Sequence, residues 1–334
     1  MKVIVTGGTG YIGSHTAAAL LQRGHQVLII DNLSNSNARA LEGIAAIGGS
    51  KPEFIEADVR DAAALAAAFV RFAADAVIHF AGLKSVAESM LHPLRYYDCN
   101  VTGTITLLRA MLAHNVRSLV FSSSATVYGS SAKVPILETA AIAPVNPYGQ
   151  SKAMVETILT NLAASEADWH IACLRYFNPA GAHPGGLLGE DPRGTPNNLM
   201  PYVTQVASGR HEKLSIFGND WPTPDGTGVR DYVHVVDLAE AHLCALDKLD
   251  DIDGLVIANI GTGRGHSVLE VVRAYEQVCG KALPVEFAPR RAGDVAESYC
   301  APGLAEKLFG WRARCGLEDM CRDAWGREQL TTED

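Results

Sequence analysis

A glycine-rich loop between the first expected strand and the first expected helix constrains the fold of this chain more than any other segment. Residues 2–6 are rich in β-branched side chains, as in a buried parallel strand, and residues 10–23 have the apolar spacing of a helix. Between them, Gly7 allows a tight turn, Gly10 lets the backbone approach a pyrophosphate, and Gly13 lets the helix pack closely on the strand. The loop is therefore a variant of the dinucleotide-binding fingerprint, which holds a diphosphate at a helix N-terminus.

An acidic residue at the end of the second expected strand, residues 26–31, indicates which dinucleotide binds. Asp31 stands where a carboxylate meets the ribose hydroxyls of the adenosine, and it would repel a 2′-phosphate. Strand, loop, helix and acid together favour NAD over NADP. The alternative to a dinucleotide site is an ordinary helix N-terminus that happens to lie near a surface acid.

The alternation of strands and helices further along predicts an α/β fold built on a doubly wound parallel sheet, the Rossmann arrangement. We expect strands at 53–56, 76–80, 118–122 and 171–177, and helices at 98–114 and 148–165. Glycine and proline interrupt residues 179–196 and 218–228, which is typical of a smaller C-terminal α/β lobe. The expected domains are 1–178 for the cofactor, with later segments around 230–246 returning to it, and 179–334 mainly for the substrate.

Ser124, Tyr148 and Lys152 are the residue types that oxidation of an alcohol by a nicotinamide requires. The hydroxyl proton must leave with the hydride, so a base must lie within hydrogen-bonding reach of that oxygen. The ordinary pKa of tyrosine, about 10, is too high for this task. Lys152 lies one helical turn from Tyr148, so its ammonium and the positive nicotinamide ring would favour the phenolate. A Tyr/Lys pair at this spacing also occurs by chance, and the glycine loop is what distinguishes this one.

Composition excludes several other classes of protein. The length of 334 residues suggests about two domains, and 48% apolar residues suffice for a sizeable core. The net charge of −9 includes no basic run, so we expect no nucleic-acid partner. Seven cysteines without Cys-x-x-Cys spacing favour reduced thiols, and eleven histidines form no ligand pattern, so no metal site is expected.

From the sequence we expect no targeting or membrane segment in this chain. The apolar run before Gly7 is too short for a signal peptide. Residues 62–80 are the most apolar long stretch, but Arg71 and Asp75 interrupt it, so we interpret it as a helix followed by a strand. We expect a cytoplasmic protein without a membrane partner.

Eight segments give the chain a specific resemblance that runs from the first strand to residue 294. They are VTGGTGYIGSH (5–15), DNL (31–33), HFAGLK (79–84), FSSSATVYG (121–129), RYFNP (175–179), PNNLMP (196–201), GTGVRDYVH (226–234) and RRAGD (290–294). With these segments the chain resembles the UDP-glucose 4-epimerase family, within the extended short-chain dehydrogenase/reductase superfamily. The resemblance implies that Tyr148 takes the proton of the sugar 4-hydroxyl while the C4 hydride passes to tightly bound NAD. The 4-keto sugar would then turn over and take the hydride back on its other face.

The resemblance also implies the binding residues. Those expected to hold NAD are Gly7, Gly10, Tyr11, Ile12, Gly13, Asp31, Asn32, Asn35, Ser36, Asp58, Val59, Phe80, Ala81, Gly82, Lys84, Ser122, Tyr148, Lys152 and Tyr176. Those expected to hold the UDP-hexose are Lys84, Ser124, Ala125, Thr126, Tyr148, Phe177, Asn178, Asn198, Leu199, Ser215, Phe217, Arg230, Arg291, Asp294 and Ser298. Arginine suits the diphosphate because its fork can bond two oxygens.

Three further expectations come from the same resemblance. Ser298, four residues after Asp294, stands where the family has a residue lining the sugar pocket; a small side chain there would admit UDP-GlcNAc and UDP-GalNAc as well. The alternative is a register shifted by one, with Tyr299 at that place. Cys99 stands where the family often has asparagine, so no polar cofactor contact is assigned to it. A homodimer would form through the helices at 98–114 and 148–165.

Two other functions stay open from the sequence. A nucleotide-sugar dehydratase or reductase of the same superfamily is disfavoured, because the dehydratases carry Thr-Asp-Glu where this chain has Ser124, Ala125 and Thr126. A non-catalytic NAD-binding regulator would not need the intact set of Ser124, Tyr148 and Lys152.

Overall fold

Seven parallel strands form the central sheet of this computed structural model, which describes residues 1–130, 133–166, 168–191, 196, 198–291, 293–332. They are β1 (Lys2–Thr6), β2 (Gln26–Asp31), β3 (Glu53–Glu56), β4 (Ala76–His79), β5 (Ser118–Ser124), β6 (His170–Tyr176) and β10 (Gly254–Ile260). Their order is β10-β6-β5-β4-β1-β2-β3. The chain therefore reverses direction across the sheet between β1 and β4, and such a switch point opens a crevice at the carboxyl ends of the strands. The doubly wound sheet is confirmed.

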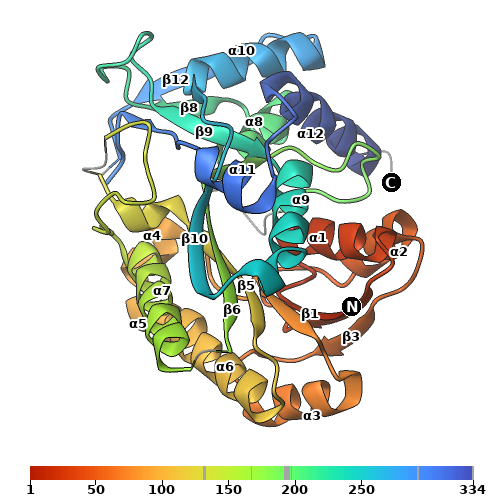
Figure 1. The fold of residues 1–334 in the computed structure, drawn as a ribbon. Coiled ribbons are helices and arrows are strands. Elements are labelled where there is room, and N and C mark those ends of the chain that lie inside the picture. The colour runs from red at the N-terminus through yellow and green to blue at the C-terminus, as the bar shows by residue number, and fades with distance from the viewer. Residues whose placement is uncertain (131–132, 167, 192–195, 197, 292, 333–334) are drawn as a thin grey trace.

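Helices cover both faces of this sheet (Figure 1). One face packs against α1 (Tyr11–Gln22), α2 (Ala40–Gly48), α9 (Val235–Leu246) and α11 (Gly303–Phe309). The other packs against α3 (Ala62–Phe72), α6 (Gly103–Ala113) and α7 (Pro147–Ser165). Side chains alternate along a strand, so Val3 and Val5 enter the first core while Ile4 enters the second. The short connecting helices are α4 (Val86–Leu91), α5 (Pro93–Tyr96) and the 3₁₀ turns Ala125–Tyr128 and Leu249–Asp251.

A smaller lobe lies over one end of the central strands (Figure 1). Its strands are β7 (Asn178–Ala180), β8 (Leu214–Phe217), β9 (Val229–His234), β11 (Gly265–Ser267), β12 (Val285–Ala288) and β13 (Glu297–Ser298). Its helices are α8 (Leu199–Ala207), α10 (Val268–Cys279) and α12 (Leu317–Thr332). Met200, Val203, Ile216, Tyr232 and Tyr275 are buried in a core of its own.

Two features of the fold differ from the sequence-based expectation. The helix expected at 98–114 begins as a π-helix, Tyr97–Thr102, and continues as α6. The sheet also gains β10, which pairs with β6 and was not expected. Residues 254–260 thus join the central sheet after the chain has passed through β9 in the smaller lobe. The domain limits proposed from the sequence remain a prediction. Asn197 and Ala292, members of two quoted motifs, lie outside the described residues.

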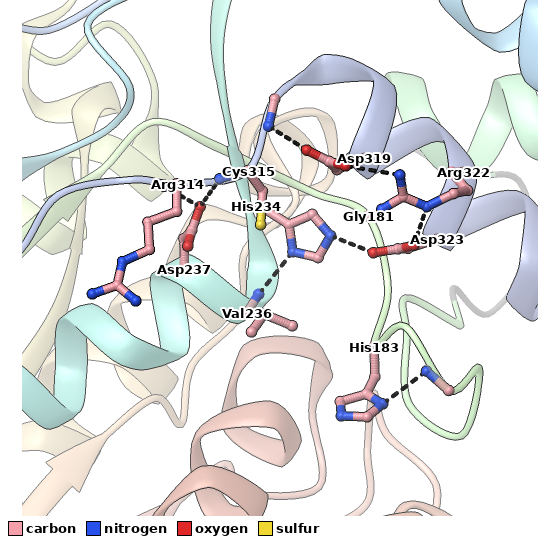
Figure 2. A network of polar contacts seen from close by, with 12 residues as sticks. Gly181, His183, His234, Val236, Asp237, Arg314, Cys315, Asp319, Arg322 and Asp323 are labelled. Carbon is pink, nitrogen blue, oxygen red and sulfur yellow. Dashed lines mark hydrogen bonds and ion pairs between the residues drawn. The ribbon is translucent and has the colours of Figure 1, made fainter.

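A buried polar network ties α12 to the start of α9 (Figure 2). His234 Nδ1 accepts a hydrogen bond from the Val236 N–H at 3.1 Å, so Nε2 carries the proton and faces Asp323 Oδ2, also at 3.1 Å. Asp237 accepts the Cys315 N–H at 2.8 Å. The histidine in the 226–234 motif thus has a structural role. Within the described residues, none of the helices is long and apolar enough to cross a membrane.

Candidate active site

The turn after β1 has the shape that a diphosphate requires. Gly7 has φ of 69°, where a side chain would be strained, and a Cβ there would lie 2.6 Å from Ala81 N. A Cβ on Gly13 would lie 2.3 Å from Gly7 O. Helix α1 begins at Tyr11, and its N-cap is Gly10, which has no side chain to cap it. The backbone N–H groups of its first turn therefore suit an anion, and the residues fit the NAD diphosphate.

Asp31 fixes this turn relative to the loop after β2. Its Oδ2 accepts the Thr9 N–H at 3.1 Å, and its Oδ1 accepts the Leu33 N–H and the Ser36 hydroxyl, both at 2.9 Å. A carboxylate has room for further donors beyond these three. It can therefore accept ribose hydroxyls while it holds the loop in place.

The far edge of the crevice is held by Asp58, which follows β3. It accepts Asn32 Nδ2 at 2.8 Å, and Arg60 binds it through two nitrogens, each at 2.8 Å. The hydrogen bonds from Arg60 lower the pKa of Asp58, so it stays ionised. Arg60 also pairs with Asp98. Loops after β2 and β3 are thereby tied to the π-helix.

The other residues expected to contact NAD also lie around the strand ends. Tyr11 and Ile12 open α1, and the Tyr11 hydroxyl donates to Gly181 O at 2.6 Å. Phe80, Ala81, Gly82 and Lys84 follow β4, Asn35 is exposed in the loop after β2, Val59 is buried beside Asp58, and Tyr176 ends β6. The structure thus gathers all of them on the two sides of the switch point.

Tyr148 and Ser124 face each other across the same crevice. Ser124 is the last residue of β5, and Tyr148 is the second residue of α7, which Asn146 caps by accepting the Gly149 N–H at 2.8 Å. Burial raises the pKa of Tyr148, and a hydrogen bond from Ser124 and the charge of Lys84 oppose that effect. A half-buried phenol that lies near a hydroxyl and a cation can exchange a proton with a bound alcohol.

Lys152 makes its direct contacts at the end of β5, and its expected effect on Tyr148 stays a prediction. Its ammonium donates to the Ser122 carbonyl at 2.7 Å and lies 4.9 Å from the centre of the Phe121 ring. Burial lowers its pKa to about 8. The charge of Lys84 opposes the rise in the pKa of Tyr148, while the Lys152 side chain runs to the end of β5. Lys152 nevertheless lines the same crevice.

A buried ion pair behind these residues was not found from the sequence. Glu156 lies one turn after Lys152 on α7, and its carboxylate binds Arg175 Nε at 2.9 Å and Nη2 at 2.6 Å. Ser123 donates to the same carboxylate at 2.5 Å. No local spacing indicated this pair, because Arg175 lies on β6, 19 residues after Glu156. The pair fixes β5, β6 and α7 against one another at the site.

The C-terminal lobe presents arginines towards the expected substrate position. Arg291 lies 4.6 Å from the centre of the Phe217 ring and pairs with Asp294 at 3.1 Å. Arg230 on β9 is half-buried, and burial lowers its pKa. The remaining predicted contacts are Ala125 and Thr126 in a 3₁₀ turn, Phe177 and Asn178 after β6, Asn198 and Leu199 at the start of α8, and Ser215 on β8. Ser215 donates to Glu286 at 2.9 Å.

Strand register separates Ser298 from Tyr299. Ser298 on β13 pairs with Arg230 on β9, so their side chains lie on one face of the sheet. The Tyr299 ring lies on the other face, where a Cβ on Gly265 would come within 3.1 Å of it. Ser298 therefore shares a face with the expected diphosphate ligand, and Tyr299 does not.

Comparison with known proteins agrees with this geometry. The model of the NAD dependent epimerase/dehydratase family matches residues 3–261. The UDP-glucose 4-epimerase of Bacillus subtilis (strain 168) is 54% identical over 325 residues, which cover 97% of this chain and 96% of that protein.

Solved structures extend the agreement over the whole chain. The UDP-glucose-4-epimerase from Stenotrophomonas maltophila, with bound NAD and formylated UDP-arabinopyranose, has a TM-score of 0.98 at 51% identity, covering 100% of this chain and 99% of that one. The UDP-glucose 4-epimerase from Bifidobacterium longum, in complex with NAD+ and UDP, has a TM-score of 0.96 at 46% identity over 99% of both chains. The chain therefore belongs to the UDP-glucose 4-epimerases within the NAD dependent epimerase/dehydratase family.

Proposed function

We propose that this protein interconverts UDP-glucose and UDP-galactose, with Tyr148 as acid/base and Ser124 as its partner. The observation that carries the proposal is the proximity of Tyr148 at the start of α7 to Ser124 at the end of β5, where Ser124 opposes the rise that burial causes in the pKa of Tyr148. Bound NAD would accept the C4 hydride and return it to the opposite face of the sugar. Tyr148 exchanges the proton of the sugar 4-oxygen, and Ser124 donates a hydrogen bond to that oxygen. Arg230 and Arg291 hold the diphosphate, so the hexose can turn while the nucleotide stays anchored.

The test is incubation of the purified protein with UDP-galactose and no added cofactor, followed by separation of the UDP-hexoses. We expect UDP-glucose to form, because oxidation followed by reduction leaves the cofactor unchanged and NAD stays bound. Net loss of water or consumption of NADH would instead assign the chain to the dehydratases or reductases. Binding of NAD and UDP without any turnover would support the regulator.

We also propose that the enzyme accepts UDP-GlcNAc and UDP-GalNAc. Ser298 shares a sheet face with Arg230, and its small side chain leaves room for an acetamido group beside the anchored nucleotide. Overpacking a tight pocket costs roughly 1–3 kcal/mol. Ser298→Tyr should therefore slow the N-acetylated reaction about ten-fold or more and spare the plain hexoses. Tyr299→Phe, on the opposite face, is the matched control. A wild-type protein that turns over UDP-galactose but not UDP-GlcNAc would refute the proposal.

The assembly and cellular setting are proposals as well. We propose a homodimer formed through α7 and the helix at 98–114, acting in cytoplasmic galactose metabolism and UDP-sugar supply. Met154 on α7 is 39% exposed. Leu91 on α4 and Leu94 on α5, two helices that pack against α7, are 76% and 81% exposed, which supports a covered surface. Sedimentation at micromolar concentration tests it: a monomer there would contradict the dimer.

A further inference from the structure

One carboxylate connects two residues that the sequence assigns to ligands. Glu190 Oε1 accepts a hydrogen bond from Lys84 Nζ at 2.8 Å and another from Asn198 Nδ2 at 2.7 Å. The Glu190 side chain is 10% exposed, whereas that of Lys84 is 51% exposed. The carboxylate is thus enclosed, while its cationic partner opens onto the crevice.

The same lysine acts on the acid/base. Loss of hydration lowers the pKa of Lys84. The attraction of the Glu190 carboxylate raises it by more, so the pKa of Lys84 is raised overall. The Lys84 charge in turn lowers the pKa of Tyr148. Glu190 also acts on Tyr11 on α1. Burial and the Glu190 charge raise the pKa of Tyr11, and the charge of Arg327 lowers it. Glu190 therefore influences Tyr148 through Lys84.

We propose that Glu190 is an internal counter-ion that holds Lys84 and Asn198 until the substrate diphosphate takes over their hydrogen bonds. This role rests on the proposed function, since it requires both donors to meet the nucleotide. Diphosphate oxygens and a carboxylate are anionic acceptors of the same kind, so they compete for the same N–H groups. Glu190 is a positioning residue that acts through Lys84, and part of the binding free energy of UDP goes into displacing it.

The direction of the mutant effect separates this role from a structural one. Glu190→Gln removes the competing charge and keeps an acceptor for Asn198. We expect it to bind UDP roughly three- to ten-fold more tightly by calorimetry on the holoprotein, because one anion near the diphosphate is gone. The acidic limb of the pH profile for kcat/KM should move to lower pH, since Lys84 then acts on Tyr148 without a counter-ion.

Two controls restrict the interpretation. Glu53 on the outer strand β3 forms a surface ion pair with Arg71 on α3. Glu53→Gln removes an equal charge there, and it should leave the affinity for UDP unchanged. In a Lys84→Met background, Glu190→Gln should lose most of its effect, because the residue through which it acts is absent.

A wild-type measurement covers the case in which the variant does not fold. In a crystal structure of the holoprotein with UDP, the Lys84 Nζ to Glu190 Oε1 distance should exceed roughly 4 Å, the limit of an ion pair. An unbroken pair there, or unchanged or weaker UDP binding by Glu190→Gln, would overturn the counter-ion role. A wild-type protein that neither binds UDP nor converts UDP-galactose would overturn the proposed function instead.

Discussion

At the scale of single residues, the site separates charge from proton transfer. Tyr148 carries the exchangeable proton. Burial raises its pKa, and the nearby Ser124 hydroxyl and the charge of Lys84 oppose that rise. Lys152 is held by the Ser122 carbonyl, and its own pKa falls to about 8 on burial. Its charge is therefore partly lost above neutral pH. The two lysines of the site thus hold different positions, and neither can simply replace the other.

Removal of the Tyr148 hydroxyl tests this division. Tyr148→Phe should lower kcat by roughly 10²-fold or more, the range for loss of a positioned acid/base. The affinity for UDP should change little, because Arg230 and Arg291 lie in the other lobe. A coupled assay with UDP-galactose and calorimetry with UDP measure the two effects. A variant whose kcat stays within a few fold of wild type would remove Tyr148 from its assigned role.

At the scale of elements, the π-helix Tyr97–Thr102 supports the loop that follows β4. Its Asn100 is buried; Oδ1 accepts the Leu83 N–H at 2.8 Å, and Nδ2 donates to Leu83 O at 3.0 Å and to Ser151 Oγ at 2.9 Å. π-helical turns often mark functional sites. Here the turn aims one amide at the loop that carries Gly82 and Lys84 and also at α7.

Asn100→Ala should therefore affect both stability and cofactor retention. It leaves the buried Leu83 N–H and C=O without partners, which costs about 1–3 kcal/mol per buried group. We expect the free energy of unfolding to fall by about 2 kcal/mol or more, and less NAD to remain after gel filtration. Denaturant titration and absorbance of the eluted protein measure these changes. Thr102→Ala, at an exposed position of the same turn, should change stability by less than about 0.5 kcal/mol; equal losses in both variants would contradict the role of Asn100.

The sequence predicts elements better than it predicts side-chain partners. The bounds of β1, β2 and β3 agree with the expectation. For β1 and β2 the reason is that buried parallel strands are nearly continuous apolar runs, whereas β3 has an exposed glutamate at each end. Strand β10 was missed because only its pairing with β6 makes Gly254–Ile260 part of the sheet. The π-helical turn has the same apolar spacing as an α-helix. The direction of the Lys152 side chain, and the hydrogen bonds of Glu190 to Lys84 and Asn198, depend on contacts between different segments of the chain. No local sequence pattern contains such contacts.

At the scale of the whole molecule, buried histidines link stability to pH. His15, His79 and His242 are at most 3% exposed. Burial lowers the pKa of His15 and His79 to about 3 and that of His242 to about 4. They lie in α1, β4 and α9, which belong to the central sheet and the helices that cover it.

The sign of this linkage predicts loss of stability in mild acid. An unfolded histidine takes up a proton below pH 6.5, whereas these folded ones stay neutral until about pH 4, so the unfolded state binds more protons in between. The contribution of these histidines to the free energy of unfolding is fully present above pH 6.5 and falls with decreasing pH. Each histidine contributes a slope of about 1.4 kcal/mol per pH unit near pH 5. Denaturant titrations of the holoprotein between pH 7 and pH 5 measure the slope. His15→Gln should reduce it by about 1.4 kcal/mol per pH unit near pH 5, while His92→Gln, at an exposed position, should leave it unchanged. A His15→Gln slope equal to that of wild type would mean that His15 is not held neutral in the folded protein.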